Sequence, residues 1–143
     1  MAQTERVGLA PRPLTEALAR KAGDVALAKA AELGTTMSVA VVDGSGQLVY
    51  FVRGDGTGFH TLESSRGKAA TSAAFRWPTA EMGELFQKHP GFFASLGNLG
   101  LVPIGGGVPL TQDGLLIGAV GCGGGSAEND EICAQAGAAA INT

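Results

Sequence analysis

The chain has 143 residues, of which 10 are Lys or Arg and 13 are Asp or Glu, and its formal net charge at pH 7 is −3. This length is typical of one domain, and the acidic balance argues against general nucleic-acid binding, which relies on basic side chains that neutralise phosphates. No apolar run reaches the roughly 18 residues of a transmembrane helix, and the first residues lack the apolar segment of a signal peptide, so we predict a cytoplasmic protein with no membrane or nucleic-acid partner.

The positive charges are unevenly distributed along the chain. All 10 Lys and Arg residues lie between Arg6 and Lys88, whereas the segment from His89 to Thr143 holds four acidic residues and no basic one. A basic contact to an anionic ligand must therefore come from the first two-thirds of the chain or from another subunit.

The N-terminal part is predicted to form a tail and then a helix. Residues 1–12 read as a flexible tail, and residues 13–143 as a single domain. Thr15 can cap a helix that runs to about Leu33, where Gly34 is a suitable C-terminal stop.

A hairpin and a second helix are predicted next. Met37–Val42 and Gln47–Arg53 are apolar runs rich in strand formers, and Asp43–Gly46 between them has the chemistry of a hairpin turn. A helix fits Thr61–Arg76 and ends before Pro78, because the residue that precedes proline disfavours helical geometry.

The last part of the chain repeats this pattern. A short helix over Thr79–Gln87 and a loop over His89–Gly100 are followed by strands near Val108–Thr111 and Leu115–Gly121, and Ser126 can begin a final helix. Helices and hairpins in this order predict an α/β fold of the α+β kind, with an antiparallel sheet rather than βαβ units.

Two glycine triplets, at 105–107 and 123–125, flank the second hairpin. Glycine inside a strand costs about 0.5–1 kcal/mol relative to alanine, so this repetition indicates tight turns or a close approach of the main chain to a ligand. The second triplet precedes a helix, as in dinucleotide-binding folds, but Ser126 stands where that motif needs a third glycine, and no ribose-binding acid follows. A tight turn is favoured over a nucleotide site.

The predicted second helix carries a polar stripe. Its members lie at helical spacing: His60, Ser64, Lys68, Thr71 and Phe75. His60 could ligate a metal or accept a proton, and Lys68 or Arg66 could hold a carboxylate. The alternative is an ordinary solvated helix face.

Other catalytic chemistry has weaker support. Cys122 and Cys133 lack the spacing of a metal site or a disulfide framework, and we expect both to be reduced and buried. No Gly-x-Ser-x-Gly nucleophile motif is present. Asp55 lies in a turn, where loops often carry function, or it only caps that turn.

Several short motifs together resemble the GlcG/HbpS-type haem-binding family, which includes the C-terminal domain of PduO. The resemblance spans roughly residues 14–140, and in chain order its motifs are Val41–Asp43, Arg53–Gly56, Gly67–Thr71, Pro78–Thr79, Gly105–Pro109 and Gly124–Asp130. It implies a profilin-like fold with a central antiparallel sheet of about five strands flanked by helices, and assembly into homo-oligomers. Several relatives bind haem.

The first functional hypothesis that this resemblance implies is haem or related tetrapyrrole binding, in haem sensing, storage or degradation. His60, or alternatively His89, would ligate the iron, and Lys68 or Arg66 would hold the propionates. The glycines expected to line the ligand site are Gly105, Gly106, Gly107, Gly123 and Gly124.

The second hypothesis is a cofactor-independent enzyme that acts on a small anionic or carbonyl-bearing metabolite. Lys68 or Arg66 would position the substrate, with His60, Asp55 or Glu128 as the proton carrier. Free N–H groups of the glycine segments would stabilise developing negative charge. A non-catalytic assembly subunit is a third reading, because alanine-rich helices suit subunit packing.

Overall fold

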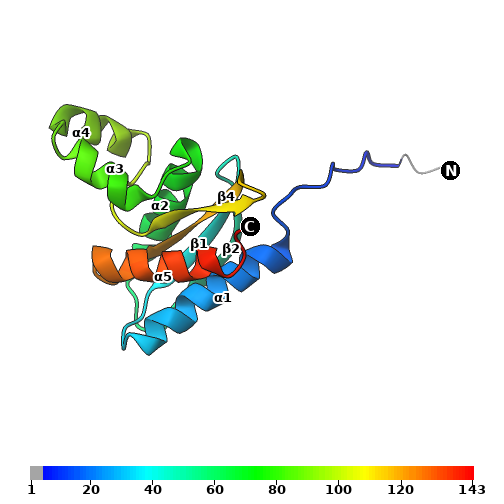
Figure 1. The fold of residues 1–143 in the computed structure, drawn as a ribbon, viewed down its shortest axis with the longest axis horizontal. Coiled ribbons are helices and arrows are strands. Elements are labelled where there is room, and N and C mark those ends of the chain that lie inside the picture. The colour runs from blue at the N-terminus through cyan, green and yellow to red at the C-terminus, as the bar shows by residue number, and fades with distance from the viewer. Residues whose placement is uncertain (1–4) are drawn as a thin grey trace.

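A computed structural model of the chain describes residues 5–143, and Figure 1 shows its fold. The elements follow one another as α1 (Glu16–Glu32), β1 (Ser38–Asp43), β2 (Leu48–Arg53), α2 (Thr61–Phe75), α3 (Thr79–Phe86), α4 (Pro90–Asn98), β3 (Gly107–Gln112), β4 (Leu115–Gly123) and α5 (Ala127–Ala139). The predicted order of helix, hairpin, helices, hairpin and helix is confirmed, with one additional helix, α4.

The four strands form one antiparallel sheet in the order β2-β1-β4-β3. Each predicted hairpin supplies two neighbouring strands, and β1 pairs with β4 in the middle of the sheet. The α+β class is therefore confirmed. The expected count of about five strands is wrong, because the two hairpins use the strand-forming runs and the segment between them folds into three helices.

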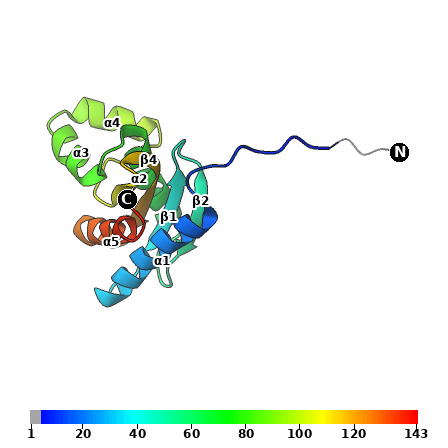
Figure 2. The same cartoon turned by 45° about the vertical axis from the view of Figure 1, so that its right-hand side comes forward.

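Helices cover both faces of this sheet (Figures 1 and 2). α1 and α5 pack against each other and against one face, and α2 covers the other. α3 and α4 lie beyond α2 at one end of the molecule. Val39 and Val41 point into the larger core with α1 and α5, whereas Val42 joins a small core with two alanines of α2.

Small residues bring α1 and α5 close together. Ala22 and Ala26 are fully buried in α1, and a Cβ atom at Gly137 would lie 2.5 Å from the Ala22 carbonyl oxygen. These two helices therefore approach at backbone distance. The alanine-rich composition is used for packing within the chain.

The segment predicted as a loop over His89–Gly100 is the helix α4, so that prediction is wrong. Pro90 occupies the first turn, where proline is well tolerated because its missing N–H has no intrahelical partner there. Glycines in the segment suggested a loop, but burial of Leu96 against α3 holds the helix in place.

Residues 5–12 of the predicted tail form neither helix nor strand, and its residues 1–4 lie outside the described part of the chain. Val7 and Leu9 are exposed there. Among the helices of residues 5–143, none is both long enough and apolar enough to cross a membrane.

Candidate functional site

The two glycine segments meet α2 at one end of the sheet. A Cβ atom at Gly106 would lie 2.6 Å from the Cys122 carbonyl oxygen and 2.9 Å from Cδ of Lys68. A Cβ atom at Gly107 would overlap the Lys68 carbonyl oxygen. Glycine is required at both positions because the main chain of one segment touches the other strand and the helix directly.

Lys68 is enclosed where these segments meet. Its Nζ donates hydrogen bonds to Asp130 Oδ2 at 2.9 Å and to the Cys122 carbonyl oxygen at 3.0 Å. The side chains of Lys68 and Asp130 are only 7% and 3% exposed. The ammonium group is therefore held in a buried ion pair that ties α2 to α5, and the polar stripe of α2 is not a solvated face at this point.

Two successive carboxylates at the start of α5 hold the glycine segments. Asp130 Oδ1 accepts a hydrogen bond from the Gly125 N–H at 3.0 Å, and Glu131 Oε2 accepts one from the Gly106 N–H at 3.0 Å. Burial raises the pKa of Glu131, and the hydrogen bond from Gly106 offsets part of that rise. The Gly107 N–H donates to Thr79 Oγ1 at 2.8 Å. The N–H groups that were expected to be free for a substrate are thus used internally at Gly106, Gly107 and Gly125, and that expectation is wrong for these three.

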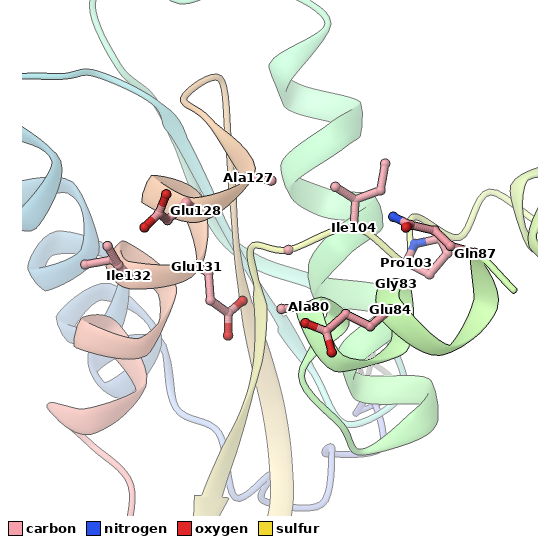
Figure 3. Close-up of a pocket in the computed structure, with 11 residues that line it drawn as sticks. Ala80, Gly83, Glu84, Gln87, Pro103, Ile104, Ala127, Glu128, Glu131 and Ile132 are labelled. Carbon is pink, nitrogen blue, oxygen red and sulfur yellow. The ribbon is translucent and has the colours of Figure 1, made fainter.

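A cavity of about 370 Å³ lies on the other side of the first glycine segment (Figure 3). It opens between α3, the segment 103–105 and the first turns of α5, and we call it the α3–α5 cavity. Its apolar walls are formed by Ala80, Pro103, Ile104, Ala127 and Ile132. Gly83 and Gly105 let these elements pack closely, since a Cβ atom at Gly83 would lie 2.7 Å from the Pro103 carbonyl oxygen.

Three carboxylates border the α3–α5 cavity. Glu84 comes from α3, and Glu128 and Glu131 come from α5. Among the described residues that line it there is no Lys or Arg. The cavity is therefore apolar in its walls and negative in its charge.

The structure places the predicted site residues in three different environments. Gly105 and Glu128 line the α3–α5 cavity, and Lys68 lies in the buried ion pair. Gly106, Gly107 and Gly123 are buried where the glycine segments meet α2. The remaining residues are exposed and do not line the cavity: Asp55, His60, Arg66 and Gly124.

The exposed group lies at and before the start of α2. The ring of His60 packs over Gly58 and contacts Phe59 edge-on, with the ring centroids 6.4 Å apart. His60 makes no side-chain capping bond to the helix. Arg66 pairs with Glu63 at 2.6 Å. At about 100° per residue, Arg66 lies about 120° around the helix axis from His60, so the imidazole and the guanidinium group are both accessible but on different sides of α2.

His89 lies away from that face, at the start of α4, and is also exposed. Cys122 and Cys133 are free and buried, as predicted. Burial raises the pKa of both thiols, for Cys122 well above its usual value, so neither is an activated nucleophile. Among residues 5–143 no group of three His, Cys, Asp or Glu side chains is arranged to hold a metal ion.

Glu84 and Glu131 line the α3–α5 cavity, but the sequence did not identify them as site residues. The spacing of Glu128 and Glu131 was a usable signal, because residues three apart lie on the same helix face. As a site residue, Glu128 was named only as a possible proton carrier, and Glu131 was not named. Glu84 gave no comparable signal, since only the packing of α3 against the segment 103–105 brings it to the cavity.

A family model described as haem degrading protein HbpS-like matches residues 14–139. An uncharacterized 15.0 kDa protein of the dhaT-dhaS intergenic region of Citrobacter freundii is 35% identical over 128 residues, which cover 85% of this chain and 87% of that protein. The corrinoid adenosyltransferase PduO of Salmonella typhimurium is 33% identical over 119 residues, which cover 82% of this chain but 35% of PduO. The chain thus spans about a third of PduO.

Solved structures with the same fold include one of HbpS and one of PduOC. A double mutant of HbpS from Streptomyces reticuli superposes with a TM-score of 0.83 at 30% identity, covering 100% of this chain and 96% of that one. A PduOC:heme complex superposes with a TM-score of 0.81 at 31% identity, covering 90% of this chain and 95% of that one. The HbpS match therefore covers the whole of the sheet and its flanking helices.

Proposed function

The chain belongs to the HbpS-like family of haem degrading proteins, and on this basis we propose that it binds haem. The observation that carries the proposal is the match of nearly the whole chain to this family, together with the fold shared with a PduOC:heme complex. Sensing, storage and degradation of haem are roles that such binding would serve.

Haem does not fit the α3–α5 cavity. The residues that line it include no His, Cys, Met or Tyr to ligate iron. Its three carboxylates would repel the propionates, and no basic side chain offsets them. We therefore place the proposed haem site elsewhere on the molecule.

The surface around His60 fits haem better. The imidazole is exposed, and Phe59 beside it is 83% exposed, so an apolar ring can pack there. Arg66 lies six residues further along α2, a rise of about 9 Å at 1.5 Å per residue. In the proposal His60 ligates the iron and Arg66 pairs with a propionate.

Lys68 has an indirect role in this proposal. Its ammonium group is enclosed by Asp130 and the Cys122 carbonyl oxygen, so it positions α2 rather than contacting the ligand. Haem, when bound, would supply a redox-active iron. The chain would supply the imidazole, the guanidinium group and an apolar contact.

We also propose that the protein self-associates. A porphyrin on the exposed His60 surface would have one face covered by this chain, and Phe59 and Leu62 leave apolar area uncovered there. A second copy would bury both the ligand and this area. Light scattering with and without hemin tests this, and an unchanged monomer in both would overturn it.

A titration with hemin, followed at the Soret band, tests haem binding. We expect a saturable shift for the unaltered protein and its loss in His60→Ala. His89→Ala is the matched control, because His89 is also exposed but lies at the start of α4, and it should bind as the unaltered protein does. No saturable shift in the unaltered protein would overturn haem binding, and an unchanged shift in His60→Ala would overturn the assigned ligand.

The second candidate, a cofactor-independent enzyme, is favoured by one observation, the α3–α5 cavity itself. Gly105 and Glu128 line it, and Glu131 offers a second carboxylate for proton transfer. An anionic substrate is disfavoured by these charges, which leaves a carbonyl-bearing one. Native mass spectrometry of the purified protein tests this candidate, and a protein that carries and turns over no carbonyl metabolite would exclude it.

A further inference from the structure

We propose that the α3–α5 cavity is a binding site for an organic cation, a protonated amine on a small apolar body. The cavity is separate from the His60 surface, so this inference does not depend on haem binding. It also names a ligand class opposite in charge to the anionic metabolite expected from the sequence.

The shape of the cavity suits a small ligand. Its volume of about 370 Å³ lies within the range of about 300–1,000 Å³ that is usual for small-molecule sites. Ala80, Pro103 and Ile104 line one side, and Ala127 and Ile132 line the other. A short alkyl or cyclic body would be buried between these walls, with apolar contact on both sides.

The charge of the cavity selects a cation. Figure 3 shows the carboxylates of Glu84 and Glu131 turned toward the same space from opposite elements, with Ala80 between them. Neither they nor Glu128 form an ion pair with any residue of 5–143. The positive end of α5 offsets about half an elementary charge, which leaves a net negative field over an apolar floor.

The carboxylate of Glu131 is already held in position in the protein without a ligand. Its carboxylate is half-buried and is fixed by hydrogen bonds from the Gly106 N–H at 3.0 Å and from Gln135 Nε2 at 3.1 Å. Its position costs no further ordering when a ligand arrives, and a half-buried carboxylate gains more from a cation than an exposed one does. A metal ion is a poorer occupant, because among residues 5–143 no three ligating side chains converge here.

The test compares three probes of one shape: butylamine, butanol and butyrate. Each is titrated into isotopically labelled protein at low salt, and the amide shifts of Gly105 and Ala127 are followed by NMR. We expect saturable shifts with butylamine, at least about tenfold weaker binding of butanol, and no binding of butyrate, since one charged hydrogen bond contributes roughly that factor. Equal affinity for butylamine and butanol, or binding of butyrate, would overturn the proposal.

Variants locate the binding. Glu84→Gln and Glu131→Gln should each weaken butylamine about tenfold, and Glu32→Gln on the exposed end of α1 is the matched control that should change nothing. Glu84 makes no hydrogen bond to another side chain of residues 5–143, so its variant remains informative if Glu131→Gln disturbs the fold. Unchanged affinity in Glu84→Gln would overturn the site.

Discussion

Asp130 and Glu131 are neighbours in α5 but occupy opposite environments. Asp130 is 2% exposed and is paired with Lys68, whereas Glu131 borders the α3–α5 cavity with no basic partner among residues 5–143. A helix turns by about 100° per residue, so two adjacent carboxylates face different sides of the glycine segment 105–107. One side is closed by an ion pair, and the other is open to a ligand.

The side that holds Asp130 contributes to the stability of the fold, and the side that holds Glu131 is available for binding. On the closed side each polar group has a partner, and removal of one partner leaves the other charge buried. On the open side the carboxylates can exchange water for a ligand at little structural cost. Variants on the closed side should therefore change the free energy of unfolding, and variants on the open side should change affinity.

The largest expected effect comes from Lys68→Met. It leaves the Asp130 carboxylate buried without its cation and should lower the free energy of unfolding by about 3–5 kcal/mol. Urea denaturation measures this change. Lys21→Met on the exposed face of α1 is the matched control and should stay close to the unaltered protein.

A double variant sharpens this prediction. Lys68→Met combined with Asp130→Leu removes both charges and should recover part of the loss, because no buried charge is left without its partner. The recovery should be incomplete, since Asp130→Leu also removes the acceptor of the Gly125 N–H. A loss below about 1 kcal/mol in Lys68→Met would instead place the pair in the class of weak surface ion pairs.

A smaller effect is expected from Gly107→Ala. The new Cβ would overlap the Lys68 carbonyl oxygen, so the strand and α2 must separate, and overpacking of this kind typically costs about 1–3 kcal/mol. Gly91→Ala in α4 is the control, because a Cβ atom there meets nothing within 4 Å. Thermal unfolding should show a lower Tm for Gly107→Ala and an equal or higher one for Gly91→Ala.

Much of the fold was predictable because its signals are local. The turn at Asp43–Gly46 and the cap at Ser126 depend on residues within a few positions of each other, and the structure has both. The helix α4 was not predictable in the same way. Its proline and glycines suggest a loop, and its stability depends on Leu96 packing against a separate helix.

The candidate site was predictable only in part. The two glycine segments and the lysine of α2 do meet, but the glycines had indicated tight turns or a close approach to a ligand, whereas the close approach is to the helix and the neighbouring strand. That the ammonium group finds Asp130, 62 residues further along the chain, depends on how α2 and α5 cross the sheet. The ion pair fills the space around Lys68, where a ligand was expected. The open cavity lies instead between α3 and α5, on the other side of the glycine segment.

The smallest expected effect concerns Glu131 and depends on pH. Burial raises the pKa of this carboxyl above the ordinary value of 4.5, so the folded chain holds the proton more tightly than the unfolded chain does. The native state is therefore penalised above the folded pKa, and the penalty is absent below pH 4.5. Glu131→Gln removes the charge and keeps an acceptor for the Gly106 N–H.

We expect Glu131→Gln to be more stable than the unaltered protein at pH 7 by a few tenths of a kcal/mol, since solvent screens this half-exposed group, and to equal it at pH 4. Denaturation at both pH values measures the difference, with Glu84→Gln as a control that should be neutral at both. A difference that does not depend on pH would show that the substitution acts through packing. If the variant is stabilised yet binds butylamine more weakly, Glu131 is retained at a cost in stability, which is the pattern of a binding residue rather than a structural one.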